Sequence, residues 1–171
     1  MTDHIRLATA ADLPAINAIY NQAVARRFLT ADLQPVSMER RLDWFAAHDP
    51  ARYPVYVYEE QGQVLGWLSL SAYRPGRQGL QDVAEISYYV DEARQGMGIG
   101  SQLMAHAIAE SRRMKKRVLF AVIIEGNAAS LALLQKFAFQ QWGYLPQVVS
   151  CAGQLRGQIY LGRILDPAGQ S

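Results

Sequence analysis

The stretch from residue 85 to residue 101, EISYYVDEARQGMGIGS, restricts the fold of this chain more than any other. Its first half places β-branched and aromatic residues between acidic ones, which predicts a strand at residues 86–90. Three glycines then alternate with apolar residues before a helical pattern begins. A strand that passes through a glycine-rich turn into a helix exposes backbone N–H groups, with a partial positive charge, at the helix N-terminus. The sequence therefore predicts an anion-binding loop at residues 96–101.

Three kinds of ligand loop, and also a purely structural turn, agree with this glycine pattern. A phosphate-binding loop of the ATPase type requires a lysine after the glycines, and this chain has none there. A dinucleotide-binding loop requires an acidic residue about 20 residues further on, and Glu125 stands roughly in that place. A pyrophosphate-binding loop for coenzyme A agrees better with the order of the surrounding elements. The glycine spacing alone does not decide among them.

Composition and charge exclude several classes of protein. The chain has 171 residues, half of them hydrophobic, which is enough for one domain with its own core. A net charge of +2 favours neither nucleic acid nor a membrane surface as a partner. The lone Cys151 excludes an intrachain disulfide, the histidines lack metal-ligand spacing, and there is neither a membrane-spanning run nor a signal-peptide core. We expect one cytoplasmic domain at residues 1–165 without a metal, and a disordered tail at residues 166–171.

The first third of the chain predicts a strand and two helices. Residues 4–24 contain a short extended run followed by apolar residues at helical spacing. After an irregular segment, Ser37 is expected to cap a second helix. The apolar side chains of that helix, Leu42, Phe45 and Ala46, are expected to face the core.

The remainder of the chain predicts a mixed sheet. Two β-rich runs within residues 55–70 form a hairpin, and with the strand before the glycine loop they form an antiparallel meander. The apolar run at residues 118–124 predicts a strand parallel to that one. A helix capped by Asn127 and a final strand pair at residues 141–151 and 158–165 follow. The expected fold class is α/β, with a central sheet of about seven strands and flanking helices.

This order of elements and two motifs resemble the GCN5-related N-acetyltransferases (the GNAT family). The segment QGMGIG at residues 95–100 matches the Gln/Arg-x-x-Gly-x-Gly/Ala signature of that family. The segment NAAS at residues 127–130 opens the following helix, as the second motif of the family does. Within the family, residues 19–24, Trp44-Phe45 and the position of Glu85 are most similar to the phosphinothricin and methionine sulfoximine acetyltransferases. The resemblance covers residues 4–165.

The resemblance implies transfer of an acetyl group from acetyl-CoA to the primary amine of a small amino acid-like substrate. An amine attacks a thioester only when neutral, so a base must accept a proton from the ammonium, directly or through water. Glu85 resembles the catalytic base of the family. A backbone N–H near Val90 is expected to stabilise the oxyanion of the tetrahedral intermediate. Subfamily members resemble one another in pairing, so a homodimer is also expected.

The resemblance also places coenzyme A on one strand end, the glycine loop and the next helix. Residues 97–101 would hold the pyrophosphate, and the strand end would pair with the pantetheine arm. Asn127 is explained equally well as a helix cap and as a pantetheine contact. Lys136 is either a surface lysine or a coenzyme A contact. The expected cofactor-binding residues are Tyr89, Val90, Gly96, Met97, Gly98, Ile99, Gly100, Ser101, Asn127 and Lys136.

The acceptor site is expected among loop residues. Tyr73-Arg74 matches the aromatic-arginine pair in the amino-acid pocket of the subfamily, where a guanidinium would hold a substrate carboxylate in bidentate fashion. An arginine in a loop is otherwise simply solvated. Phe28 and Leu29, between the first two helices, are expected to wall the same pocket.

Departures from the family pattern leave the acceptor side open. Ala138-Phe139 replaces the usual Gly-Phe, Leu133-Leu134-Gln135 replaces the usual polar or histidine-containing segment, and residues 153–157 replace a Gly-Arg-Trp-x-Asp pattern. The proton donor for the departing thiolate is consequently undecided, with Tyr144 and Tyr160 as candidates. Two alternatives to the small-molecule enzyme remain: a protein N-terminal or polyamine acetyltransferase, and a non-catalytic acyl-CoA-binding regulatory module.

Overall fold

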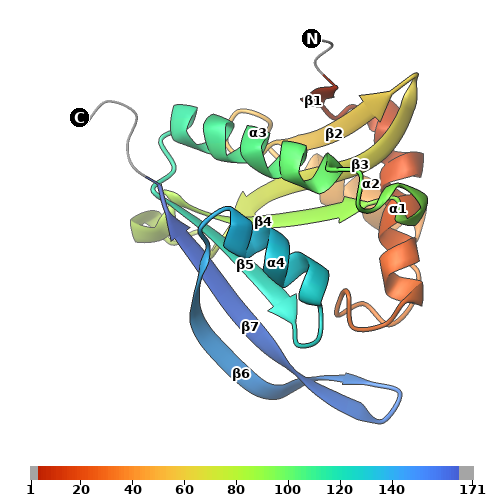
Figure 1. Cartoon of the computed structure of the whole chain (residues 1–171). Coiled ribbons are helices and arrows are strands. Elements are labelled where there is room, and N and C mark those ends of the chain that lie inside the picture. Colours follow the sequence, from red (N-terminus) through yellow and green to blue (C-terminus); the bar gives the residue numbers. More distant parts are fainter. Residues whose placement is uncertain (1–3, 166–171) are drawn as a thin grey trace.

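A mixed sheet of seven strands organises the computed structural model, which describes residues 4–165 (Figure 1). The strand order is β1-β2-β3-β4-β5-β7-β6, and β4 and β5 form the parallel pair among otherwise antiparallel neighbours. The predicted fold class, the meander and the parallel crossover are therefore confirmed. The disordered tail expected at residues 166–171 lies outside the described residues.

The elements follow the predicted order. In sequence they are β1 (Ile5–Leu7), α1 (Leu13–Ala25), α2 (Met38–Ala46), β2 (Val55–Glu60), β3 (Gln63–Ala72), β4 (Val83–Val90), α3 (Ile99–Arg113), β5 (Val118–Ile124), α4 (Ala128–Lys136), β6 (Gln140–Cys151) and β7 (Gln154–Ile164). Strand β7 begins earlier than predicted because Ala152 and Gly153, both with positive φ, form a two-residue turn. No helix within residues 4–165 is long and apolar enough to cross a membrane.

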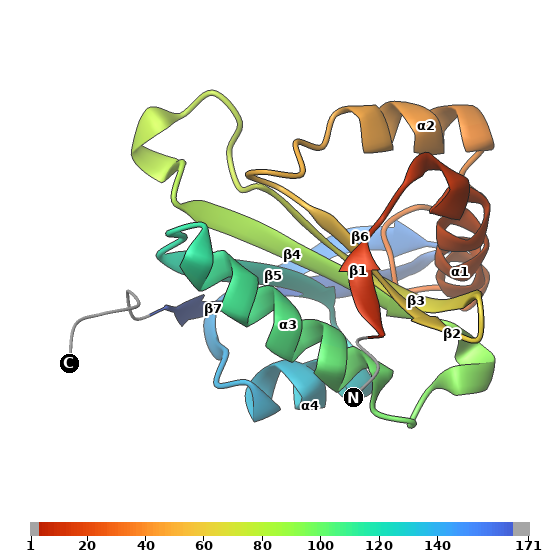
Figure 2. The same ribbon diagram turned by 90° about the horizontal axis from the view of Figure 1, so that it is seen from above.

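Helices cover both faces of the sheet. Figure 2 shows α3 and α4 on one face, here called the α3 face, and α1 and α2 on the other, the α1 face. The larger apolar cluster packs α3 and α4 against the sheet and includes Leu103, Met104 and Leu134, all buried. The smaller cluster packs Leu13 and Ile16 of α1 against β2 and β3. Side chains of β4 alternate between the two faces, as the strand period requires.

The apolar face predicted for α2 is wrong at two of its three positions. Leu42 is 52 % exposed and Ala46 is exposed as well. Arg41 is buried instead, because its guanidinium lies over the rings of Tyr20 and Trp44, at 4.6 and 4.7 Å from their centroids. A guanidinium stacked on aromatic rings packs as a flat, partly apolar group, which a pattern of hydrophobic residues does not register.

Strands β4 and β5 separate soon after they meet. Their pairing joins residues 83–85 to residues 118–120 and ends there. Beyond this point, residues 86–90 of β4 pair with β3 along one edge only. The backbone N–H and C=O groups on the other edge of β4 therefore face a gap, where they need a partner other than β5.

Candidate active site

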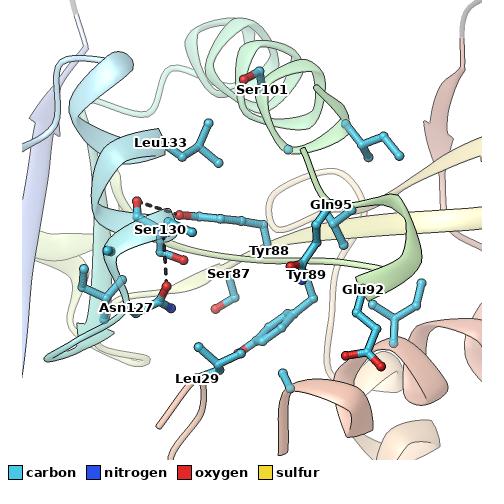
Figure 3. A pocket seen from close by; sticks show the side chains of 18 of the residues that line it. Leu29, Ser87, Tyr88, Tyr89, Glu92, Gln95, Ser101, Asn127, Ser130 and Leu133 are labelled. Atoms are coloured by element: carbon cyan, nitrogen blue, oxygen red, sulfur yellow. Dashed lines mark hydrogen bonds between the residues drawn. The ribbon is translucent and has the colours of Figure 1, made fainter. Parts of the chain in front are cut away.

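A cavity of about 680 Å³ lies where β4 and β5 separate (Figure 3). Its walls come from β4, the glycine loop and start of α3, the end of β5 with α4, and α1 with the segment after it. Both faces of β4 contribute: Tyr88 points toward α4, whereas Tyr89 points to the opposite side, toward Leu29. The cavity therefore passes through the sheet from the α3 face to the α1 face.

The glycine loop gives this cavity an anion-binding end. Gly98 is the N-cap residue of α3 and adopts a φ of 84°, which glycine reaches without strain. No side chain caps this helix, so the first N–H groups of α3 are free to bind a ligand. Gly100 has a different role, because a Cβ there would lie 3.2 Å from Leu133 Cδ2 of α4. Met97 is 60 % exposed and does not line the cavity, unlike the other residues predicted to bind the cofactor.

Two side chains of the α4 region lie at the same cavity. Asn127 Oδ1 accepts a hydrogen bond from the Ser130 N–H at 3.1 Å, so the predicted helix cap is present. The Asn127 amide nitrogen makes no hydrogen bond within residues 4–165, which leaves it available to a ligand. Lys136 Nζ donates to Ser101 Oγ at 3.0 Å, which places a cation beside the first turn of α3. Both predicted positions therefore border the cavity.

Glu85 lies on the α1 face just beyond the cavity, and it is not one of the residues that line it. It lies two residues before Ser87, a cavity residue, or about 7 Å along the strand. Its neighbours across the sheet are Ser71 and Phe120. The carboxyl makes no hydrogen bond or ion pair within the described part of the chain, and burial raises its pKa above the usual range. A carboxylate with a raised pKa is better matched to accepting a proton near neutral pH.

The phenols considered as proton donors lie outside the cavity. Tyr144 is 46 % exposed, and the ring of Tyr160 packs 5.3 Å from that of Phe120. Tyr88, which sequence analysis missed, does line the cavity, and its hydroxyl donates to the Ser130 carbonyl at 3.3 Å. Burial raises the pKa of Tyr88 to about 12, so the phenol keeps its proton at neutral pH. A tyrosine in an alternating strand resembles any other core residue, which is why the sequence did not distinguish it.

The predicted acceptor residues border the site without lining the cavity. The Tyr73 ring packs edge-on against Phe120, 4.8 Å between centroids, and Phe120 is the β5 neighbour of Glu85. Arg74 is exposed, and its guanidinium lies 5.6 Å from the Tyr73 ring centroid. Phe28 does not line the cavity either, although the next residue, Leu29, does. The structure thus brings Tyr73 close to the base and Phe28 close to the cofactor cavity.

Helix α1 closes one side of the cavity, which the sequence did not predict. Gln22 Oε1 accepts a hydrogen bond from the Glu92 N–H at 3.0 Å, and Arg26 Nε lies 2.7 Å from Glu92 Oε2. These contacts join α1 to the segment before the glycine loop across 66 to 70 residues of sequence. No local pattern contains that information. Within residues 4–165, no group of three metal-binding side chains comes together.

Comparison with known proteins agrees with this geometry. A family model described as the acetyltransferase (GNAT) family matches residues 16–139. An L-methionine sulfoximine/L-methionine sulfone acetyltransferase of Pseudomonas paraeruginosa is 36% identical over 168 residues, which span 98% of this chain and 97% of that protein.

Solved structures give the same result. The crystal structure of a GNAT superfamily phosphinothricin acetyltransferase from Sinorhizobium meliloti in complex with AcCoA has a TM-score of 0.89 and 28% identity, covering 96% of this chain and 89% of that one. The crystal structure of a ribosomal-protein-alanine N-acetyltransferase from Brucella melitensis has a TM-score of 0.89 and 40% identity, covering 94% and 99%.

Proposed function

This chain belongs to the acetyltransferase (GNAT) family, and from that premise we propose that it acetylates the α-amine of a small amino acid. Acetyl-CoA is the co-substrate, as in the phosphinothricin acetyltransferase solved with it. The observation that carries the proposal is one cavity with an uncapped helix N-terminus at one end, together with an unpaired carboxyl, Glu85, just beyond the cavity wall on β4. The helix N-terminus suits a pyrophosphate, and the carboxyl suits an amine that must lose a proton.

The two ends of the cavity determine the orientation in which acetyl-CoA binds. Its pyrophosphate binds the N–H groups at the start of α3, with Lys136 as a nearby cation. The pantetheine arm extends along the open edge of β4, where residues 86–90 offer unpaired backbone groups. Asn127 adds its amide nitrogen to that arm. The thioester then lies toward the point where β4 and β5 rejoin, within reach of an amine beside Glu85.

The chemical step follows from these positions. Glu85 takes a proton from the substrate ammonium, directly or through water, and the amine attacks the thioester carbonyl. A backbone N–H of β4 near Val90 stabilises the oxyanion. Collapse of the intermediate breaks the C–S bond, and the Tyr88 hydroxyl donates a proton to the departing sulfur. The nitrogen loses its second surplus proton to solvent, which returns a proton to Tyr88, so the products are the amide, coenzyme A as its thiol and the one proton that Glu85 took from the ammonium and releases to solvent.

The acceptor class comes from the relatives. The Pseudomonas relative is an acetyltransferase for methionine sulfoximine and methionine sulfone, and the Sinorhizobium neighbour is a phosphinothricin acetyltransferase. These compounds are amino acids with a polar, tetrahedral group in the side chain. We place such an acceptor on the α1 face, between Phe28 and the pair Tyr73 and Arg74.

A second candidate function is acetylation of a protein N-terminus. The Brucella structure, a ribosomal-protein-alanine N-acetyltransferase, is as similar in fold and more similar in sequence than the Sinorhizobium one. A free amino acid and a peptide N-terminus present the same amine. They differ in the group on the other side of the α-carbon, which is a carboxylate in the first and an amide in the second.

The test is a thiol-release assay with acetyl-CoA and a panel of amines. The panel contains methionine sulfoximine, methionine sulfone, phosphinothricin, ordinary amino acids, polyamines and peptides beginning with alanine. Turnover confined to the modified amino acids is the expected result, and preference for the peptides supports the second candidate. Tight acetyl-CoA binding without turnover on any amine contradicts both and favours a regulatory module.

We further propose that residues 1–165 act as one cytoplasmic domain that pairs as a homodimer. The edge strand β6 and its neighbour β7 carry exposed apolar side chains, among them Trp142, Val148 and Leu155 at 47, 52 and 54 % exposure. A group of this kind on a sheet edge suits contact with a second copy. Sedimentation velocity decides whether the chain is a dimer.

A further inference from the structure

The proposed base lies outside the cavity in which its substrate must react. Glu85 is not part of the cavity wall, whereas Ser87, two residues further along β4, is. Every second residue of a strand is about 7 Å away, and one hydrogen bond joins heavy atoms only about 3 Å apart. Two hydrogen bonds through a water molecule cover about twice that distance. Water is therefore a suitable carrier for a proton that passes from an amine in the cavity to Glu85.

Three serines of β3 and β4 surround this route. In the antiparallel register Ser71 lies opposite Glu85, and Ser69 lies opposite Ser87. Side chains of directly opposite residues share one face of a sheet, with Cβ atoms about 5 Å apart. The glutamate and the three serines therefore occupy the corners of a rectangle of about 5 Å by 7 Å.

This rectangle lies on the α1 face, where the acceptor is proposed to bind. The next pair along the same register is Trp67 and Tyr89, whose ring centroids lie 5.0 Å apart. Trp67 belongs to the apolar cluster that packs α1 against the sheet. Figure 3 shows Ser87 on the same side of β4 as Tyr89, whereas Tyr88 points to the other side. Ser87 thus lines the part of the cavity that opens toward the α1 face.

The serine hydroxyls are free to bind water. Within residues 4–165 none of the three makes a hydrogen bond. Ser69 is only 3 % exposed, yet its oxygen is not among the fully enclosed polar atoms that lack a partner in the described structure, so it still reaches open space. Buried hydroxyls are normally satisfied by protein groups or ordered water. A buried water makes about three hydrogen bonds, and Ser69, Ser87 and the Glu85 carboxylate supply three partners.

Aromatic rings lie on the other side of the base. The β5 neighbour of Glu85 is Phe120, and the Tyr73 ring packs edge-on against Phe120 at 4.8 Å between centroids. Within the described part of the chain the Glu85 carboxyl has neither a hydrogen bond nor an ion pair, and burial raises its pKa. The serines are therefore the polar side chains next to Glu85 along the sheet.

We propose that Ser87 and Ser69 hold a water molecule that carries the first proton of the substrate ammonium to Glu85. This inference rests on the proposed function, since it assumes Glu85 as the base. The ammonium N–H gives its proton to the water, and the water gives one of its own protons to the Glu85 carboxylate, so the water is regenerated. A hydroxyl both donates and accepts, which lets the serines orient the water while keeping their own protons. Ser87 and Ser69 are positioning residues in this step.

The experiment measures kcat with the full-length chain, saturating acetyl-CoA and L-methionine sulfone as acceptor. The variants are Ser87→Ala, Ser87→Thr, Ser69→Ala, Glu85→Gln and the double variant Glu85→Gln with Ser87→Ala. Ser150→Ala is the control, because Ser150 is an exposed strand serine outside the cavity.

Ser87→Ala is expected to lower kcat about 10- to 100-fold, as part of the larger loss that removal of the base causes. KM for acetyl-CoA stays at the wild-type value. Ser87→Thr keeps the hydroxyl on a residue suited to a strand and restores most of the rate. Ser69→Ala gives a smaller loss, and Ser150→Ala gives none.

The double variant separates a proton route from a structural role. If Ser87 acts only through the base, Ser87→Ala costs about 2-fold or less once Glu85 is already glutamine, because the two losses are not independent. A loss in the double variant as large as in the wild-type background overturns the inference. So does a Ser87→Thr variant as slow as Ser87→Ala, since the hydroxyl then has no role.

Two other results distinguish this inference from the proposed function. Full activity of Ser87→Ala beside a slow Glu85→Gln overturns the water route and leaves the base and the acetyltransferase in place. Full activity of Glu85→Gln, or a wild type that binds acetyl-CoA and acetylates none of the amines in the panel, overturns the proposed function, and the inference fails with it.

Discussion

The two ends of the active site are built in different ways. The cofactor end consists mainly of backbone, with the open edge of β4, the glycine turn and the first turn of α3 all falling within residues 86–101. The proposed acceptor end consists of side chains from segments far apart in the sequence: Phe28 after α1, Tyr73 after β3 and Glu85 on β4. The difference teaches that binding of the shared cofactor is encoded locally, whereas acceptor choice depends on tertiary packing and is free to change without disturbing the cofactor end.

The largest expected effect is on kcat, and it comes from a substitution that removes the proposed base and leaves the cofactor end intact. Glu85→Gln is expected to lower kcat about 100- to 10,000-fold, because the amide cannot accept the proton of the ammonium. The cofactor end is unaffected, so the Kd for acetyl-CoA in isothermal titration calorimetry stays at the wild-type value. A variant that loses acetyl-CoA affinity as well would show that the two ends are not independent.

The second effect concerns the departing sulfur, where the two ends meet. Tyr88→Phe is expected to lower kcat about 10- to 100-fold, with little change in either KM, because the leaving thiolate loses its donor. Tyr144→Phe is the matched control, since that phenol is exposed and outside the cavity. Steady-state kinetics on both variants decide the assignment. If Tyr88→Phe and Tyr144→Phe lowered kcat equally, the loss would not come from proton donation by Tyr88.

The third effect is confined to the cofactor end. Gly98→Ala forces a Cβ into a positive φ of 84° and is expected to raise KM for acetyl-CoA about 10-fold, as the helix N-terminus shifts from its anion-binding position. Gly62→Ala is the matched control, because Gly62 has a φ of 78° and also no atom within 4 Å of an added Cβ. Both variants should lose similar stability. If Gly62→Ala raised KM for acetyl-CoA as much as Gly98→Ala does, the increase would come from backbone strain in general and not from the anion-binding helix N-terminus.

The smallest effect is on stability and arises at the acceptor end. The folded-state pKa of Glu85 is raised by burial, so the folded chain binds its proton more tightly than the unfolded chain does. Its unfavourable contribution is absent at low pH and appears as the pH rises through the raised pKa. Glu85→Gln should therefore melt about 1 to 3 °C above wild type at pH 8, with a difference that shrinks below pH 4. Differential scanning calorimetry measures both melting temperatures. If Glu85→Gln melts below wild type at pH 8, the ionised Glu85 carboxylate does not destabilise the folded chain.

The sequence predicted the elements around the proposed cofactor end well because their signals are local. The glycine spacing, the apolar run of β5 and the Asn127 cap each act within a few residues, and each appears in the structure as expected. Met97 is the exception, since alternation along a turn does not tell which side chains point inward.

The acceptor end was less accessible to prediction. Outside the site, the buried face of α2 was missed for a related reason, because the stacked guanidinium of Arg41 counts as polar in a hydrophobic pattern. Tyr88, which lies between the two ends, was missed because the face of β4 toward α4 belongs both to the core and to the cavity wall.

A crystal structure of Glu85→Gln with acetyl-CoA and L-methionine sulfone tests the central claim most directly. The account predicts pyrophosphate oxygens within about 3 Å of the N–H groups at the start of α3 and a pantetheine arm in the gap between β4 and β5. It also predicts the α-amine beside residue 85, directly or across one water. A cofactor bound elsewhere, or an amine on the α3 face of the sheet, would contradict it.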